Sequence, residues 1–211
     1  MAVWARMILM LLAGTLPATQ VLAAKPSAGM ACEPMARLPG LRDAGVTALS
    51  MQPQDGRCVI EVAAANGNAL RRQQRMLEAL VQHACAAPAH VTVNEVQVSL
   101  QLRLPTSCAA RSNRDLFAGE GIPWLPPRGV SPRYPVEAMR QGLSGRSMLK
   151  ALVDARGRVA AVIVETSSGH ALLDDAAAEE LQGWRFSLAD AKGTVPALTL
   201  VRMPMRYEFV E

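Results

Sequence analysis

The sequence GRSMLKALVDARGRVAAVIVETSSGHALLDDAAAEELQGWRF, residues 145–186, decides the fold of the C-terminal part of this chain. Apolar residues dominate positions 146–153 and 159–165, which predicts two strands. Residues 154–157 lie between them and have the composition of a tight turn. Residues 172–184 carry apolar side chains at helical spacing and acidic ones in the first turn, where the helix dipole favours negative charge. The order strand, strand, helix indicates an α+β unit.

Residues 198–209 predict one more strand, because apolar and charged side chains alternate along them. The expected inner face comprises Thr199, Val201, Met203, Met205, Tyr207 and Phe209, opposite Arg202, Arg206 and Glu208. The strand also contains Pro204, which lacks the N–H donor that a central strand needs, so we expect it at a sheet edge. An exposed edge presents unpaired N–H and C=O groups, which an extended peptide can pair with by strand addition.

Short motifs occur through this part of the chain in one fixed order. They are Tyr134-Pro135, Gly145, Gly157, Ser167-Ser168-Gly169, Leu173-Asp174, Trp184-Arg185-Phe186 and Pro204. With them, residues 131–211 resemble the C-terminal domain of TonB-type energy transducers. The resemblance implies a three-stranded antiparallel sheet with two helices. It also implies a protein-binding module in the periplasm of Gram-negative bacteria, and we expect neither an enzyme nor a cofactor.

The same resemblance implies a partner and a binding surface. The family grips the TonB box, an extended segment of outer-membrane receptors, so we expect such a receptor or another envelope protein as partner. The candidate partner-binding residues are Ser131, Pro132, Arg133, Tyr134, Pro135, Val201, Arg202, Met203, Pro204, Met205 and Arg206. A second interpretation of Tyr134-Pro135 stays open, since a proline at the first turn also starts a short helix at 136–141.

Ser167-Ser168-Gly169 and the following His170 invite comparison with a nucleophile, its general base or a phosphate loop. No hydrolase-like spacing of carboxylate, histidine and serine accompanies them, and such a run commonly ends a strand and caps the next helix. We therefore expect no catalytic residue here. Trp184 and Phe186 are expected to belong to the core.

The first 23 residues have the features of a secretory signal peptide. Arg6 precedes an apolar run, and Val21-Leu22-Ala23 has the small-residue pattern of a cleavage site. Cleavage predicts a protein of the periplasm. The alternative is an uncleaved inner-membrane anchor facing the periplasm, although the run is shorter than the roughly 20 apolar residues that a span requires. A full energy transducer and an envelope scaffolding protein are the alternative functions, and self-association is a further possibility. The histidine-bearing anchor and the long proline-rich spacer of the family are not recognisable in this sequence.

Residues 24–108 are expected to form a small α+β domain with four cysteines. A Pro/Gly-containing linker at 109–130 is expected to join it to the C-terminal domain at 131–211. The pattern predicts strands at 46–51 and 58–63, a helix at 69–85 and a long strand at 91–104 with one bulge. The same order of elements in the C-terminal segment suggests a degenerate tandem repeat. Chance similarity of two unrelated segments is the alternative. In the linker, Phe117 and Trp124 are expected to dock on one of the domains.

The cysteines are Cys32, Cys58, Cys85 and Cys108, an even number in a chain expected in an oxidising compartment, which predicts two disulfides. If the repeat holds, its geometry predicts Cys58 with Cys85 and Cys32 with Cys108. No cysteine pair has the close C-x₂-C spacing of zinc sites, so we expect no metal. A thiol oxidoreductase is the remaining alternative, and it requires a free reactive cysteine.

The formal net charge of +4 is a mild basic excess. Its one real cluster is Arg71, Arg72 and Arg75, which on a helix forms a solvated face more often than a nucleic-acid surface. We therefore expect no nucleic-acid partner.

Overall fold

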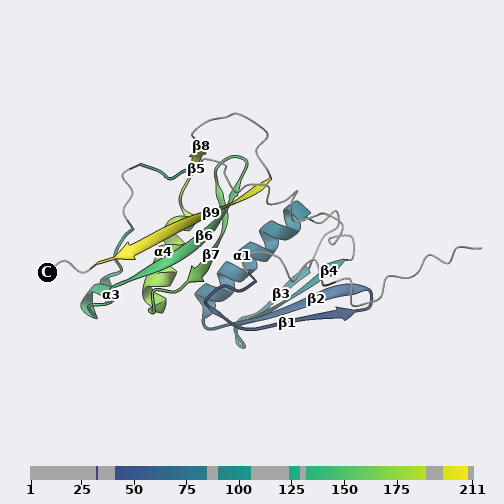
Figure 1. Ribbon diagram of the computed structural model, residues 1–211. Helices are drawn as coiled ribbons and strands as arrows, with labels where there is room; N and C mark the ends of the chain where they lie inside the picture. The colour runs from purple at the N-terminus through teal and green to yellow at the C-terminus, as the bar shows by residue number, and fades with distance from the viewer. Residues whose placement is uncertain are drawn as a thin grey trace, which may run out of the picture.

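The computed structural model describes residues 32, 41–84, 90–105, 124–128, 132–188 and 197–208 of the 211-residue chain (Figure 1). The N-terminal half of this described part forms a four-stranded antiparallel sheet with one helix. Its elements are β1 (Val46–Gln54), β2 (Arg57–Ala64), α1 (Gly67–Ala84), β3 (His90–Asn94) and β4 (Ser99–Pro105). The strands lie in the order β1-β2-β4-β3. One face of α1 carries buried apolar residues, including Leu70, Leu77 and Leu80, and packs onto this sheet.

The C-terminal half forms a three-stranded antiparallel sheet with two helices. Its elements are α3 (Val136–Arg140), β6 (Gly145–Asp154), β7 (Val159–Thr166), α4 (Ala171–Gln182) and β9 (Leu198–Tyr207). The strand order is β7-β6-β9. The predicted α+β class is confirmed, and so are the three antiparallel strands and two helices predicted for this half. On β9 the predicted inner face is also confirmed where it is described, since Met205 and Tyr207 are buried; Phe209 lies outside the described residues.

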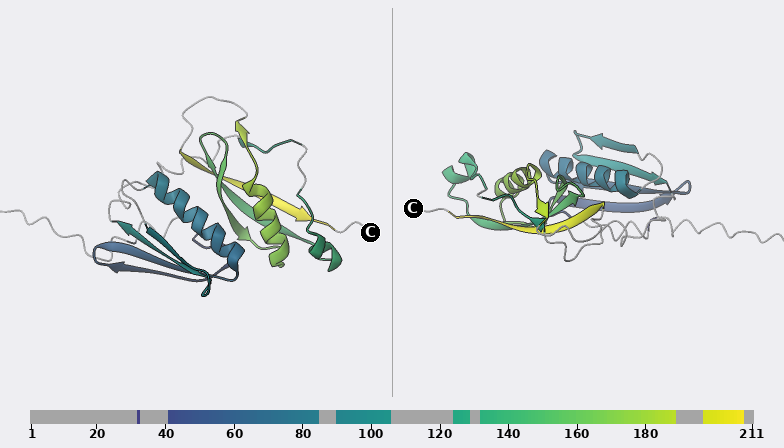
Figure 2. Two further views of the ribbon diagram at one scale, coloured as in Figure 1. Left: turned by 180° about the vertical axis from the view of Figure 1, so that it is seen from behind. Right: turned by 90° about the horizontal axis from the view of Figure 1, so that it is seen from above.

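The helix α1 lies between the four-stranded sheet and the β7 side of the three-stranded sheet (Figures 1 and 2). The hydrophobic core around α1 contains Leu152, Ile163 and Leu198 from the C-terminal sheet beside Ile60 and Leu102 from the N-terminal sheet. The other face of the C-terminal sheet packs under α4 in a second cluster. The two halves therefore share one core along α1.

A short two-stranded sheet joins the segment between the halves to the C-terminal half. It consists of β5 (Trp124–Leu125) and β8 (Ser187–Leu188), and Trp124 is buried in the cluster under α4. The expectation that Trp124 docks on a domain is confirmed, whereas Phe117 lies outside the described residues. Gly157 permits this arrangement, because its φ is +79° and a Cβ there would lie 2.1 Å from the carbonyl oxygen of Phe186.

The long bulged strand predicted at 91–104 is wrong, because this stretch is the hairpin of β3 and β4. The chain reverses between Asn94 and Ser99. The backbone N–H of Gln97 donates to Asn94 Oδ1 at 3.0 Å, Val98 takes a φ of +47°, and Val96 is 95% exposed. The change of phase in the apolar pattern therefore marks a turn and not a bulge.

The tandem-repeat hypothesis is also wrong. In the N-terminal sheet the second strand, β2, is central and pairs with β1 and β4. In the C-terminal sheet the first strand, β6, is central and pairs with β7 and β9. The two halves share the order of elements along the chain but not the order of strands in the sheet.

The predicted disulfide pairing is wrong at its described positions, because Cys32 is bonded to Cys58, with the two Cα atoms 5.1 Å apart. The prediction relied on the geometry of the repeat, which the sheet order contradicts. Both half-cystines are buried in the core that faces α1, and Cys58 lies at the start of β2. Cys85 and Cys108 lie outside the described residues, as does the expected signal peptide. In the described residues no helix has the length and apolar character needed to cross a bilayer.

Candidate partner-binding edge

The strand β9 lies at one edge of the C-terminal sheet. It pairs with β6 over its whole length, from Tyr207 opposite Gly145 to Leu198 opposite Asp154. Among the described residues, no strand pairs with its other side. The edge position expected from Pro204 is therefore confirmed.

The position of Pro204 also indicates which backbone groups of β9 face outward. Pro204 lies opposite Met148 of β6 and has no N–H to donate. In an antiparallel pair the N–H and C=O of one residue face the same neighbour, and successive residues alternate. Since proline is tolerated where its nitrogen faces away from the sheet, the outward set is Leu200, Arg202, Pro204 and Arg206, and the set bonded to β6 includes Val201, Met203 and Met205.

The opposite edge of the sheet, β7, is closed by the N-terminal half. The N–H of Ala44 donates to the carbonyl oxygen of Val164 at 2.8 Å, and the N–H of Val164 donates to Asp43 Oδ2 at 2.8 Å. The Asp43 carboxylate thus takes the place of a strand carbonyl. The Asp43 side chain is fully buried. It also accepts a hydrogen bond from the N–H of Gly45 at 2.8 Å and forms an ion pair with Arg72 at 3.1 Å.

A row of charged side chains crosses the sheet from β7 to β9. Glu165 on β7 pairs with Lys150 on β6 at 2.5 Å and with Arg202 on β9 at 2.8 Å. The hydrogen bond from Lys150, together with that from Arg202, holds the pKa of Glu165 below its ordinary value against the opposing effect of burial. Arg202 itself is 63% exposed, so its guanidinium remains at the surface of the candidate edge.

The two predicted parts of the binding surface meet at the C-terminal end of β9. The ring of Tyr134 packs edge-on against the ring of Tyr207, with centroids 5.4 Å apart, and its hydroxyl donates to the carbonyl oxygen of Leu143. Arg133 is exposed beside it. Pro135 precedes α3 directly, so the helix-start interpretation of Tyr134-Pro135 holds together with its place beside the edge. Ser131 lies outside the described residues.

Known proteins resemble the C-terminal segment of this chain. Residues 130–209 match the family described as the Gram-negative bacterial TonB protein C-terminal. The C-terminal segment is TonB-like. The TonB protein of Xanthomonas campestris pv. campestris (strain B100) is 38% identical over 76 residues, which are 36% of this chain and 34% of that protein. The TonB protein of Vibrio cholerae serotype O1 is 34% identical over 79 residues, 37% of this chain and 32% of that protein.

Among solved structures, a solution NMR structure of the Pseudomonas aeruginosa TonB CTD is similar at a TM-score of 0.36 and 22% identity, over 42% of this chain and 88% of that one. The chain spans about a third of the length of the curated TonB proteins that it matches. The resemblance expected from the motifs is confirmed for the TonB-like segment, residues 130–209.

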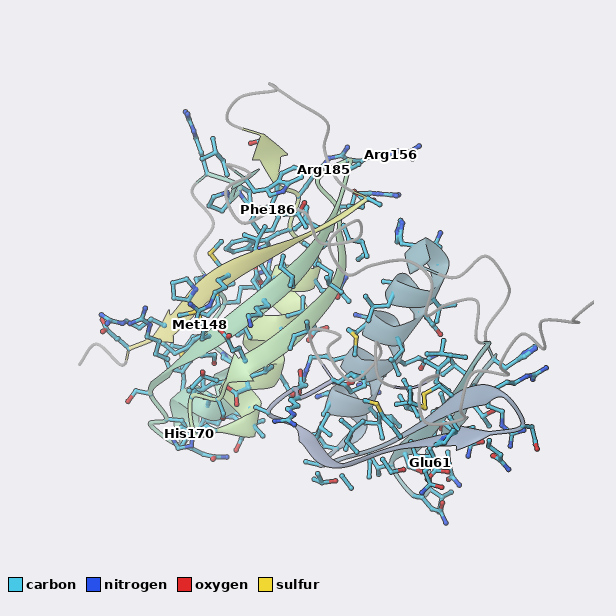
Figure 3. The ribbon with its side chains drawn as sticks, turned by 45° about the vertical axis from the view of Figure 1, so that its right-hand side comes forward. Glu61, Met148, Arg156, His170, Arg185 and Phe186 are labelled. Atoms are coloured by element: carbon cyan, nitrogen blue, oxygen red, sulfur yellow. A yellow bond between two sulfur atoms is a disulfide. The ribbon has the colours of Figure 1, made fainter. Side chains whose placement is uncertain are left out.

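The serine motif of the TonB-like segment has a structural role. Asp174, in the first turn of α4, is buried and accepts hydrogen bonds from Ser147 Oγ at 2.6 Å, from the Ser168 N–H at 2.8 Å and from Ser167 Oγ. The carboxylate therefore ties the end of β7 to α4 and to β6. His170 is the residue before α4, and it lies at the opposite end of the sheet from Phe186 (Figure 3). This geometry favours the strand-ending interpretation of the run over a catalytic one.

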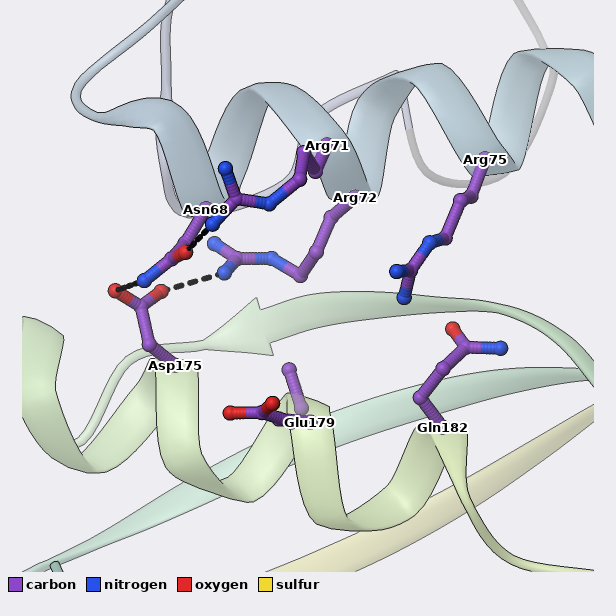
Figure 4. Close-up of a pocket in the computed structure, with 8 residues that line it drawn as sticks. Asn68, Arg71, Arg72, Arg75, Asp175, Glu179 and Gln182 are labelled. Atoms are coloured by element: carbon purple, nitrogen blue, oxygen red, sulfur yellow. Dashed lines mark hydrogen bonds and ion pairs between the residues drawn. The ribbon is translucent and has the colours of Figure 1, made fainter.

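An ion pair and a hydrogen bond, both to Asp175, join the two halves where α1 and α4 lie side by side (Figure 4). Arg72 reaches from α1 to Asp175 on α4 at 2.6 Å and also contacts Asp43. Burial lowers the pKa of Arg72, but its hydrogen bonds and its charge interactions with the two aspartates outweigh this effect and raise it overall. The basic cluster noted in the sequence is thus partly engaged inside the protein.

Sequence reasoning missed Asp43, whose carboxylate accepts the N–H of Val164, 121 residues away. No local pattern marks an aspartate that caps the edge of a strand so distant in sequence. It also missed the link between Glu165 and Arg202, which depends on the register of three strands.

Proposed function

We propose that the TonB-like segment binds an extended segment of another envelope protein by strand addition to β9. The observation that carries this proposal is the difference between the two sheet edges. The β7 edge is occupied by Asp43 and Ala44, while in the described part of the chain β9 is paired on one side only. A peptide that pairs with β9 would satisfy the outward N–H and C=O groups of this strand.

The family resemblance supports a partner class for this edge. The curated relatives are named TonB, and the family's C-terminal domain receives the TonB box of outer-membrane receptors, so the partner proposed here is the corresponding segment of such a receptor. Localisation in the periplasm follows from that proposal. Energy transduction is the second candidate, favoured by the TonB names of relatives of which this chain spans about a third.

The test is a proline substitution at an outward position of the edge. Arg202→Pro removes one outward donor from β9 and leaves the donors that face β6 in place, whereas Arg202→Ala removes the same side chain and keeps the donor. One hydrogen bond contributes about 1 kcal/mol, which is roughly a fivefold change in affinity. The probe is a synthetic peptide with the TonB-box segment of an outer-membrane receptor from the same organism, titrated by calorimetry.

We expect the proline variant to bind at least about fivefold more weakly than the alanine variant, with both unfolding at similar temperatures. Equal binding by the two variants would place the partner away from this edge. A dimer that forms without peptide and is lost in the proline variant would instead support self-pairing through β9.

A further inference from the structure

A second surface feature lies beside the end of the candidate edge. It is a hollow between the C-terminal half of α4 and the segment that leads into α3. We call it the α4 hollow, and its walls include Pro127, Tyr134, Pro135, Glu179, Glu180 and Trp184. Tyr134 belongs both to the hollow and to the ring contact with Tyr207 at the end of β9. An extended segment paired along β9 therefore reaches the hollow where that strand ends.

The hollow is lined by charges of both signs, and the one charged group that is half-buried is the carboxylate of Glu180. The floor of the hollow is formed by the last turns of α4, a twelve-residue helix with no basic residue in its last turn. The carbonyl groups at a helix C-terminus favour a cation. Glu180 is half-buried there, and among the described residues no cation lies within ion-pair distance of Glu179 or Glu180.

Tyr207 responds to the same field. Burial, followed by the negative charges of Glu180 and Asp174, raises the pKa of Tyr207 to about 12. Tyr207 therefore lies within the field of the Glu180 carboxylate, which lines the hollow.

The remaining walls suit the side chain of a lysine or an arginine. Trp184 and Tyr134 present aromatic rings, which attract cations and pack against long aliphatic stems.

Two arginines also line the hollow, and their placement leaves the carboxylates available. Arg133 and Arg185 are both exposed, and neither forms an ion pair with Glu179 or Glu180 in the described part of the chain. The half-buried Glu180 is thus the less solvated of the charged groups here. The attraction of Glu180 for a cation is therefore screened less by solvent than the repulsion from the two exposed arginines.

We propose that the α4 hollow receives a lysine or arginine side chain of the partner segment that pairs with β9. This inference rests on the strand addition proposed above and adds a specificity to it. The edge supplies sequence-independent backbone pairing, and the hollow selects segments with a basic residue just beyond the paired stretch. The positive side chain lies between the aromatic rings and pairs with Glu180.

The first experiment uses a random peptide library displayed on phage and selected against the whole protein. The protein is used as the wild type and as Glu180→Gln, with Glu78→Gln as the matched control on the exposed side of α1. We expect wild type and Glu78→Gln to enrich peptides with lysine or arginine at one fixed position. We expect Glu180→Gln to retain binding and to lose that enrichment. Basic residues enriched equally on Glu180→Gln would overturn the proposal.

The second experiment needs no protein variant. The best selected peptide is compared with an analogue in which norleucine replaces its basic residue, and the Trp184 indole N–H resonance is followed by NMR during titration. We expect the analogue to bind about tenfold more weakly at low salt, as for a charge-assisted contact. Equal affinity of the two peptides, or a Trp184 resonance that does not move, would contradict occupancy of the hollow.

The two proposals fail in different ways. Peptides that show no basic preference but lose affinity with Arg202→Pro would leave strand addition standing and remove the hollow. Peptides whose binding is unaffected by Arg202→Pro would remove strand addition, and the hollow inference would fall with it, as it would if no peptide were selected.

Discussion

Replacement of Asp43 tests the link between the two halves most directly. Its carboxylate is fully buried and accepts the N–H groups of Gly45 and Val164, each at 2.8 Å, as well as the guanidinium of Arg72. Asp43→Asn keeps the shape of the side chain but removes its charge and turns one acceptor into a donor. That donor then faces groups that are themselves donors.

The expected cost follows from what remains buried. Arg72 keeps only its partly exposed pair with Asp175, and one of two backbone donors loses its acceptor. Removal of one partner of a buried ion pair costs about 3–5 kcal/mol, and a buried donor left unpaired costs about 1–3 kcal/mol. These contributions overlap, so we expect Asp43→Asn to lower the free energy of unfolding by about 3 kcal/mol. The control Asp175→Asn should cost less, because Asp175 is more exposed than Asp43 and Arg72 keeps its pair with Asp43.

The assay combines urea unfolding of the disulfide-bonded protein with amide hydrogen exchange. We expect the Val164 amide to lose protection in Asp43→Asn while the amides between β6 and β9 keep theirs. A loss of stability below about 1 kcal/mol together with a protected Val164 amide would refute the idea that Asp43 closes the β7 edge.

Three further predictions concern the C-terminal half. Because burial and nearby carboxylates raise the pKa of Tyr207 to about 12, its stabilising contribution is complete below its unfolded pKa of about 10 and is lost as the pH rises through 12. Tyr207→Phe should therefore flatten the alkaline fall in melting temperature, and an unchanged alkaline curve would contradict this. Gly157→Ala should destabilise the fold by more than the roughly 1 kcal/mol expected from its positive φ, while Gly142→Ala, with a φ of +62° and open space around it, should cost only about that much; equal losses in thermal unfolding would show that the close carbonyl is not limiting. Glu165, whose pKa is lowered mainly by its hydrogen bond to the lysine on β6, stabilises the fold above its unfolded pKa and loses this effect as the pH falls through the lowered value, so Glu165→Gln should lose less than about 1 kcal/mol at neutral pH and nothing in strong acid.

The sequence predicted the C-terminal half well because its signals are local. Each strand is delimited by turn residues such as those at 154–157, and the alternation along β9 gave the correct buried face. The end of the helix was placed less well. Apolar spacing predicted a helix that extends to Trp184, whereas α4 ends at Gln182 and Gly183 forms the C-cap. Trp184 continues the apolar face of the helix although it lies in the turn that follows, so the spacing does not mark the end of the helix.

The N-terminal half was predicted less completely because its decisive features are not local. A change of phase in the apolar pattern is the same for a bulge and for a hairpin turn. The turn between β3 and β4 is visible only in the structure, in the hydrogen bond to Asn94 and in the positive φ of Val98. The same order of elements suggested a repeat, yet the sheet order depends on which strand is central, β2 in one half and β6 in the other. The predicted disulfides, Cys58 with Cys85 and Cys32 with Cys108, inherited that error, whereas the structure bonds Cys32 to Cys58.

The candidate site shows the same division between local and distant signals. Pro204 predicted that β9 lies at a sheet edge, and the family resemblance implied that Tyr134 and β9 belong to one surface. The α4 hollow had no signal of its own, because its walls come from three separate segments and its character depends on the end of α4.

The way in which the β7 edge is closed bears on the strand addition proposed for β9. A neighbouring strand closes an edge through many backbone hydrogen bonds, but here the described closure is one amide and one carboxylate at Val164. It therefore lasts only while α1 stays docked against β7, which the shared core and the pairs of Arg72 ensure. If the halves separated, the sheet would have two open edges and an uncovered apolar face, both of which favour unspecific pairing. We infer that the N-terminal half keeps β9 as the one edge at which a partner strand is added.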